Sequence, residues 1–171
     1  MTTRDEDLKI VEVPAEKRPS LQSLLSESFE GWYLRHSMKT LSNIEVVREA
    51  LIGDNPAGLV MLKTLYDKVG YVFYIAVASN YRRRGVASRL LDHSLDYFSL
   101  LGMREVYASI EQGNVESEGL FRIHNFVKTS YGEVSRKYGN LTALNLYRKM
   151  LVVPGETLLC RPLTSTQQDV V

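Results

Sequence analysis

The chain has 171 residues, a length that suits one domain with a substantial apolar core. Its formal net charge of +1 gives no general attraction to nucleic acid or to a membrane, so we expect neither as a partner. The single cysteine, Cys160, excludes an internal disulfide framework and indicates a reducing, cytoplasmic environment. No stretch approaches the roughly 18 apolar residues of a membrane-spanning helix.

The N-terminal segment predicts a strand followed by a helix. Residues 8–13 alternate apolar and polar side chains and end at Pro14, as expected for a first strand. A helix starts at Pro19, and its apolar face consists of Leu21, Leu24, Leu25 and Phe29. Residues 32–43, headed by Trp32 and Tyr33, carry no clear pattern.

Two strands and a turn come next. Residues 44–52 and 57–66 are strand-like, and the turn sequence Gly53-Asp54-Asn55-Pro56 between them predicts an antiparallel hairpin. A helix over 42–50, capped by Asn43, is the alternative, and we prefer the strand. A further turn at 67–70 leads into a third strand.

The most informative stretch runs from Tyr71 into a long helix. Residues 71–77 are aromatic and β-branched without a breaker, which predicts a buried strand. After a short break come Arg82, Arg83, Arg84 and Gly85, and from Val86 the apolar residues recur at helical intervals. The order is therefore strand, basic turn, helix.

Such a turn favours an anion. The first N–H groups of a helix have no intrahelical partner, and the helix dipole adds partial positive charge there. Arg82, Arg83 and Arg84 add full charges, so all three are expected to favour a phosphate or pyrophosphate. Gly85 lets an anion approach the main chain, and the Ser88 hydroxyl can bond a phosphate oxygen. A plain connection with solvated arginines is the alternative, whereas the P-loop and dinucleotide fingerprints are absent.

The segment Arg82-Arg83-Arg84-Gly85-Val86-Ala87 resembles the R/Q-x-x-G-x-G/A motif of the GNAT superfamily of N-acetyltransferases. The resemblance implies that the backbone amides of this turn bind the pyrophosphate of acetyl-CoA, the cosubstrate. It also implies that Ile75, Ala76 and Val77 form the end of the central strand that holds the pantetheine arm.

A second segment is similar to the same family. Residues 105–110 predict a strand, Gln112-Gly113-Asn114 breaks it, and a short helix follows over 115–124. The resemblance implies that Asn114 and Ser117 touch the pantetheine arm. The pair Asn125-Phe126 gives a weaker similarity to protein N-terminal acetyltransferases.

One residue departs from the family pattern. The family's common tyrosine, which protonates the departing CoA thiolate, falls on Phe121, and phenylalanine has no proton to give. Another group or water must then protonate the thiolate, or the chemistry is impaired. Phe121 is also one of the residues that we predict to contact the cofactor.

The C-terminal part predicts a last hairpin, with strands over 127–138 and 141–150 around Gly139-Asn140. The family uses such a hairpin as a wall of its substrate groove. We expect residues 1–153 to form a single acetyltransferase domain. Residues 154–171 would be a partly mobile extension in which Leu158 and Leu159 pack against the domain.

The predicted fold is α+β in the order β-α-β-β-β-α-β-α-β-β. The resemblance implies a mixed, mostly antiparallel sheet with a splayed centre and flanking helices. An amine would attack the thioester directly, so a group must accept its proton. A backbone N–H near Val77 would face the thioester oxygen. Glu111 and Tyr138 are the catalytic candidates, each with a purely structural alternative, and we predict no metal site. The histidines His93 and His124 lie on helices and are expected to be structural or surface residues.

These residues favour an acetyl-CoA-dependent N-acetyltransferase acting on a primary amine, of a peptide, a protein or a small molecule such as a polyamine. A non-catalytic acyl-CoA-binding or regulatory protein is the alternative, motivated by Phe121. We expect a monomer or homodimer.

Overall fold

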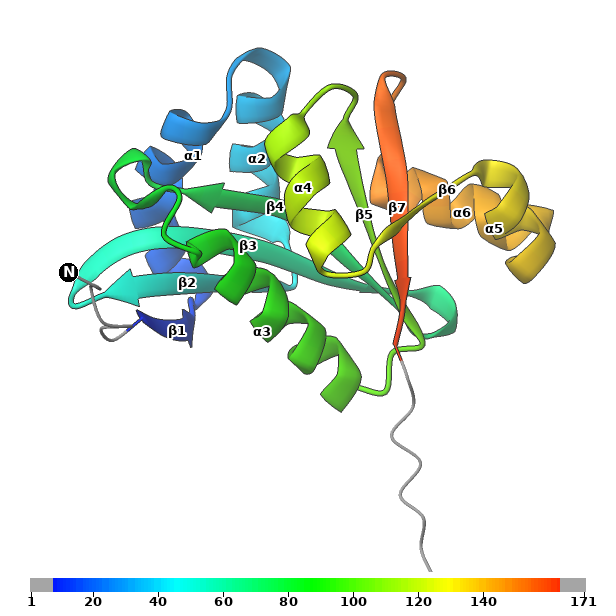
Figure 1. Cartoon of the computed structure of the whole chain (residues 1–171), viewed down its shortest axis with the longest axis horizontal. Helices are drawn as coiled ribbons and strands as arrows, with labels where there is room; N and C mark the ends of the chain where they lie inside the picture. The colour runs from blue at the N-terminus through cyan, green and yellow to red at the C-terminus, as the bar shows by residue number, and fades with distance from the viewer. Residues whose placement is uncertain (1–7, 164–171) are drawn as a thin grey trace, which may run out of the picture. The chain divides into compact units, whose positions relative to one another are not determined.

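The computed structural model of the chain describes residues 8–163. They form two compact units. The first unit consists of residues up to 63 and residues 73–94, and the second unit consists of residues 64–72 and the residues from 95 onward. The strand β4, Val69–Val77, and the helix α3, Val86–Leu100, each have residues in both units. Both elements are labelled in Figure 1.

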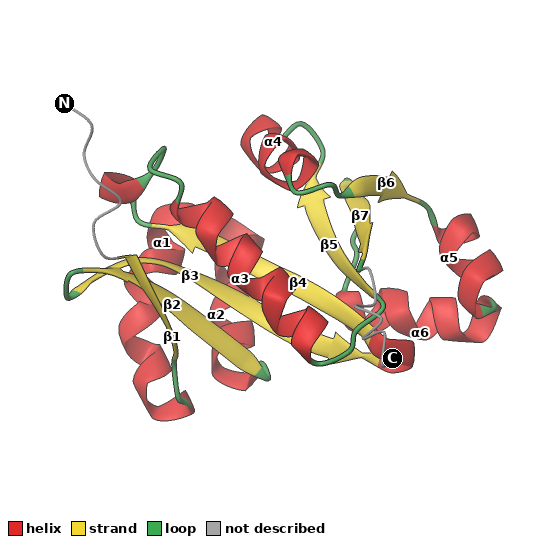
Figure 2. Cartoon of the chain, turned by 60° about the horizontal axis from the view of Figure 1, so that its bottom comes forward, coloured by secondary structure: helices red, strands yellow, loops and turns green. Residues whose placement is uncertain are grey.

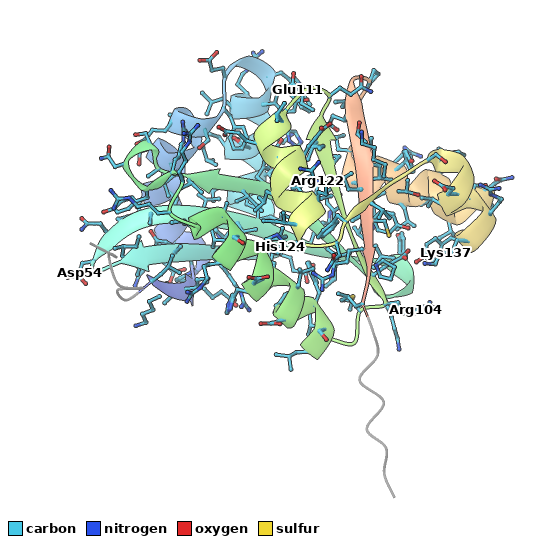
Figure 3. All side chains as sticks on the ribbon, viewed as in Figure 1. Asp54, Arg104, Glu111, Arg122, His124 and Lys137 are labelled. Carbon is cyan, nitrogen blue, oxygen red and sulfur yellow. The ribbon has the colours of Figure 1, made fainter. Side chains whose placement is uncertain are left out.

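Three antiparallel strands build the first unit: β1, Leu8–Glu12, β2, Val46–Ile52, and β3, Asn55–Leu65. The predicted hairpin of β2 and β3 is confirmed, and the helix alternative over 42–50 is wrong. Val47 lies opposite Met61 across this hairpin, and Asp54 stands at its turn (Figure 3).

Helices cover one face of these strands. A 3-10 helix, η1 (Ala15–Leu21), leads into α1, Gln22–Ser28, and then α2, Gly31–Asn43. Figure 2 shows α1 and α2 on the same side of β1, β2 and β3. Because side chains alternate between the faces of a strand, one set of apolar residues meets these helices. The resulting core includes Leu24, Leu25, Leu41, Val47, Leu59 and Met61.

The helix α2 was not predicted. Its inward residues fall at Leu34, Ser37, Met38 and Leu41, a helical spacing in which serine takes one of the buried places. The Ser37 hydroxyl donates to the Leu34 carbonyl at 2.9 Å, which satisfies it within the helix. A polar residue in the stripe therefore hid the pattern.

In the second unit, the start of β4 pairs in parallel with β5, Glu105–Glu111, from Val69↔Glu105 to Val72↔Ala108. Tyr71 and Ser109 join their hydroxyls at 2.8 Å across these two strands. The predicted short helix follows as α4, Val115–Ile123.

The predicted last hairpin is wrong. Only β6, Val127–Thr129, is a strand, and it is followed by the helices α5, Tyr131–Tyr138, and α6, Asn140–Met150. A capping box in which Ser130 and Glu133 bond each other's backbone N–H starts α5. The buried residues of α6, Ala143, Leu146 and Met150, have helical spacing.

The second strand of that region lies further along the chain. The strand β7, Glu156–Pro162, pairs antiparallel with both β5 and β6. Leu158 and Leu159 are buried in it, as expected. Part of the predicted extension thus belongs to the sheet, whose order is β1-β2-β3-β4-β5-β7-β6. Residues 164–171 lie outside the described part of the chain.

Candidate active site

The strand β4 changes its surroundings along its length. Residues Val69–Val72 are buried, as in a strand covered on both faces, whereas the three that follow, Phe73–Ile75, are partly exposed. Ala76 is buried again and Val77 is partly exposed. The residues predicted to hold the pantetheine arm, Ile75, Ala76 and Val77, thus form the end of β4 in the first unit.

The loop after β4 is held by hydrogen bonds within the first unit. The Ala78 N–H donates to the Ala57 carbonyl at 2.9 Å and continues the backbone pairing beyond the strand. The Ser79 N–H donates to Glu27 Oε2 at 2.7 Å, and this bond lowers the pKa of the Glu27 carboxyl. The turn is therefore fixed at its start by α1.

The three arginines do not act alike. Arg82 donates from Nε to the Val77 carbonyl at 3.2 Å and from Nη2 to the Glu27 carbonyl at 2.8 Å. All three side chains are exposed, and the Arg84 guanidinium lies over the Tyr81 ring at 5.6 Å. Arg82 thus holds the loop in place, and the other two add exposed positive charge.

Gly85 occupies a position that favours glycine. Its φ is +76°, a left-handed conformation that other residues adopt only with strain. A Cβ built there would meet nothing within 4 Å, so the space beside this main chain is open. The helix starts at once, because the Arg89 N–H donates to the Gly85 carbonyl at 3.0 Å. Val86 is buried, while Ala87 and Ser88 are partly buried in the first turn of α3.

The second predicted segment begins with a helix cap. Asn114 is the N-cap of α4, and its side-chain oxygen accepts a hydrogen bond from the Ser117 N–H at 3.1 Å. Ser117 is the third residue of α4, and the three-residue spacing from Asn114 is that of an N-cap and the backbone N–H it binds. It brings Asn114 and Ser117 together, as predicted from their positions in the sequence.

The other end of α4 is closed by a turn at Asn125. Asn125 has φ +62°, the left-handed conformation that glycine or asparagine adopts after a helix. Its N–H donates to the Arg122 carbonyl, and the Phe126 N–H donates to the Phe121 carbonyl at 3.0 Å, which is a Schellman motif. Phe121 is only 6% exposed and packs edge-on against Phe126.

The two catalytic candidates lie apart. Glu111 is exposed at the end of β5 (Figure 3). The Tyr138 hydroxyl instead donates to Glu105 at the start of β5. The two strand ends are about 20 Å apart at about 3.3 Å per residue. The structure therefore does not bring Tyr138 to Glu111 and Asn114.

Glu105 is the centre of a buried polar cluster. It is 1% exposed, accepts the Tyr107 hydroxyl at 2.6 Å and contacts Lys137, Tyr138 and the Cys160 thiol. Burial raises the pKa of Glu105, but the hydrogen bonds from Lys137, Tyr107 and Tyr138 outweigh it and hold the pKa below its usual value. Burial raises the pKa of Cys160 to about 12.

Sequence reasoning missed one histidine. His36, on α2, has its Nδ1 at 2.7 Å from the Tyr74 hydroxyl on β4, and the Trp32 ring stacks on its imidazole. By contrast His93 contacts Arg48, and His124 bonds the Leu120 carbonyl, which agrees with the structural roles expected for them. The partner of His36 stands 38 residues away in the sequence, so no local motif indicates the pair.

Two further findings concern residues 8–163. No described helix is long and apolar enough to cross a membrane. Within the same range, no group of three or more His, Cys, Asp and Glu residues has the arrangement of a metal site.

The sequence model of the acetyltransferase (GNAT) family matches residues 14–126, more than half of the chain. The chain therefore belongs to this family. The matched range includes β4, the arginine loop, the start of α3 and the whole of α4. No curated protein sequence matches the chain.

Solved structures share the fold at low sequence identity. The IAA acetyltransferase from Bacillus cereus is 20% identical with a TM-score of 0.68, over 92% of this chain and 100% of its own. The ribosomal-protein-S18-alanine N-acetyltransferase from Escherichia coli is 12% identical with a TM-score of 0.70, over 96% and 99%. A Bacillus subtilis acetyltransferase in complex with CoA is 15% identical with a TM-score of 0.68, over 92% and 100%.

Proposed function

We propose that this protein is an N-acetyltransferase that takes its acetyl group from acetyl-CoA and transfers it to a primary amine. The observation that carries the proposal is the loop between β4 and α3. It presents an open main chain at Gly85, a helix start and three exposed arginines together. Family membership and the CoA complex of the Bacillus subtilis acetyltransferase support the choice of cosubstrate.

Each part of the loop has a role in this proposal. Backbone amides from Gly85 to Ala87 bind the pyrophosphate, and the Ser88 hydroxyl adds a hydrogen bond. Arg83 and Arg84 add charge that favours the anion, while Arg82 holds the loop through its own bonds to the backbone. This division of work differs from the sequence prediction, which gave all three arginines to the phosphates.

The pantetheine arm would run along the end of β4. Main-chain groups of Ile75, Ala76 and Val77 are the contacts we propose there. Asn114 and Ser117 are the second set, through the Asn114 amide nitrogen and the Ser117 hydroxyl, two groups that the α4 cap does not use. Phe121 is the buried residue of α4 and packs edge-on against Phe126, which anchors the end of this helix.

The reaction we propose is direct attack of the amine nitrogen on the thioester carbon. The new C–N bond forms as the C–S bond breaks, CoA leaves as a thiolate, and the nitrogen loses a proton. A backbone N–H near Val77 would stabilise the charge on the carbonyl oxygen. A free thiol has a pKa near 8.5, so the thiolate can leave without a fixed acid, at some loss of rate. Glu111, at the exposed end of β5, stays a candidate base.

For the acceptor we propose a peptide or protein amine. The exposed Trp32 beside Tyr33 on α2 and the Asn125-Phe126 pair support this choice. The predicted tyrosine-bearing hairpin no longer does, because that region is helical. The Escherichia coli neighbour is named for a ribosomal-protein alanine and the Bacillus cereus neighbour for IAA, so the fold serves more than one acceptor class.

One experiment tests the function. The purified protein is incubated with acetyl-CoA and a panel of N-terminal peptides, polyamines and small amines, and CoA release and acetylated product are both measured. We expect product from a peptide, with CoA released in equal amount. Acetylation of spermidine but of no peptide would reverse the acceptor proposal.

The non-catalytic alternative has its own outcome in the same assay. Because Phe121 stands where the family has a tyrosine, a CoA-binding protein without activity would bind acetyl-CoA and acetylate nothing. Gain of activity by Phe121→Tyr alone would then identify a chain that has lost catalysis. Activity of the wild-type protein removes this alternative.

A further inference from the structure

An aromatic and histidine cluster lies on the first unit between α2 and β4. The His36 ring is stacked under Trp32, with 5.0 Å between centroids and planes 8° apart, and Phe73 lies 6.4 Å from it. His36 Nδ1 is 2.7 Å from the Tyr74 hydroxyl. The Tyr74 ring is fixed in turn by Phe29, edge-on at 5.1 Å. These contacts hold both rings of the pair in one geometry.

Two hydroxyl groups lie near His36 Nδ1, those of Thr40 and Tyr74. The Thr40 hydroxyl is 3.4 Å from His36 Nδ1, but it donates its proton to the His36 carbonyl at 2.8 Å. The Tyr74 hydroxyl, at 2.7 Å, lies closer to Nδ1 than the Thr40 hydroxyl does. In the neutral imidazole with its proton on Nε2, Nδ1 accepts the Tyr74 O–H. Of the Trp32, Phe73 and Tyr74 rings that contact His36, the Tyr74 ring carries an ionisable hydroxyl.

The position of Tyr74 relates the pair to the proposed reaction. Tyr74 is partly exposed on β4, three residues before Val77, whose carbonyl accepts the Arg82 Nε. Three residues of strand span about 10 Å. A pantetheine arm that leaves the arginine loop and follows β4 therefore runs toward Tyr74. The Trp32 ring, 45% exposed, is stacked on His36, the hydrogen-bond partner of Tyr74.

We infer that Tyr74 and His36 together take up the proton that the acceptor amine loses. This inference rests on the proposed acetyltransferase function. The Tyr74 oxygen accepts a proton from the ammonium form of the acceptor while its own proton passes to His36 Nδ1. The products of this step are a neutral amine, an intact tyrosine hydroxyl and an imidazolium, so protons and charge balance. No acid on β4 is needed for the amine to become nucleophilic.

The test measures kcat/KM against pH for four proteins: wild type, Tyr74→Phe, His36→Gln and the matched control His93→Gln, whose ring contacts Arg48 elsewhere in the first unit. We expect Tyr74→Phe and His36→Gln to lower kcat/KM near neutral pH by about 10²-fold, within the usual range for general base help. The deficit should shrink as the pH rises, because the free amine then forms in water. His93→Gln should follow the wild-type profile.

Two measurements separate this inference from its alternatives. Acetyl-CoA affinity should be unchanged in Tyr74→Phe, because the hydroxyl acts on the acceptor, and the melting temperature should fall by only about 2–4 °C, because one part-buried hydrogen bond is lost. In long-range ¹⁵N NMR of the wild type, His36 should carry its neutral proton on Nε2. A proton on Nδ1, or a Tyr74→Phe variant with the wild-type pH profile, overturns the relay alone. A wild type that acetylates no amine overturns the proposed function, and the relay falls with it.

Discussion

Arg82 Nη2 lies 2.8 Å from the backbone carbonyl of Glu27, and the Ser79 N–H lies 2.7 Å from the carboxylate of the same residue. Glu27, on α1, thus accepts hydrogen bonds from both ends of the loop that precedes Gly85. Arg82 therefore supports the loop, while binding of the anion is the role proposed for Arg83 and Arg84, although the three residues look equivalent in the sequence.

The first prediction follows from this division. Arg82→Ala should lower the free energy of unfolding by about 1 kcal/mol, because two hydrogen bonds to the backbone are lost. Arg83→Ala and Arg84→Ala should leave the free energy of unfolding unchanged. Each should lower the affinity for acetyl-CoA by about threefold, because an exposed charge contributes little. Chemical denaturation and calorimetric titration measure the two effects. Equal stability loss in all three variants would contradict the division.

The second prediction concerns Gly85. Gly85→Glu places a side chain and a negative charge into the open space where the pyrophosphate would lie, and we expect acetyl-CoA binding to be lost. Gly102→Glu is the matched control, because Gly102 also has a positive φ, +71°, and nothing within 4 Å of a built Cβ. Both variants carry the same kind of backbone strain. If Gly85→Glu binds acetyl-CoA as tightly as Gly102→Glu, the site lies elsewhere.

The third prediction concerns Tyr138, a catalytic candidate from the sequence. Its hydroxyl donates to buried Glu105, so Tyr138→Phe should lower the free energy of unfolding by about 2 kcal/mol and leave kcat unchanged. Tyr131→Phe on the same helix is the control, because its exposed hydroxyl donates to the Asn140 carbonyl at 3.3 Å. A fall in kcat at unchanged stability would show that Tyr138 acts in catalysis.

The fourth prediction concerns the acid side of the stability profile. Hydrogen bonds hold the pKa of Glu105 below its usual value despite burial, so the folded state binds the Glu105 proton less tightly than the unfolded state. The stabilisation is complete above the ordinary carboxyl pKa of about 4.3 and is lost as the pH falls toward the lowered value. Glu105→Gln should therefore flatten the decline in unfolding free energy below about pH 4.3. An unchanged decline would show that other carboxylates control it.

Local features of the sequence were sufficient for the strand, loop and helix around Gly85. There the signal is contiguous: an uninterrupted apolar strand, a basic turn with glycine, and helical spacing from Val86. The hairpin of β2 and β3 was likewise predicted from its turn residues. In both regions the residues that determine the structure are neighbours in the chain.

Other elements depend on partners far away in the chain or on exceptions to simple patterns. The helix α2 buries Ser37, so its apolar stripe is interrupted. The helix α5 has a capping box at Ser130, a signal that was present but outweighed by its tyrosines and by Gly139-Asn140, which resembles a hairpin turn. The contact of His36 with Tyr74 exists only once α2 packs on β4. Such a pair has no sequence spacing to recognise.

The most direct test of the central claim is a calorimetric titration of the purified protein with acetyl-CoA, together with its melting temperature at saturating ligand. A ligand that binds the native state alone raises stability. We predict saturable heat at one site per chain and a higher melting temperature, both lost in Gly85→Glu and kept in Gly102→Glu. No heat and an unchanged melting temperature in the wild-type protein would contradict the assignment of this loop to acetyl-CoA.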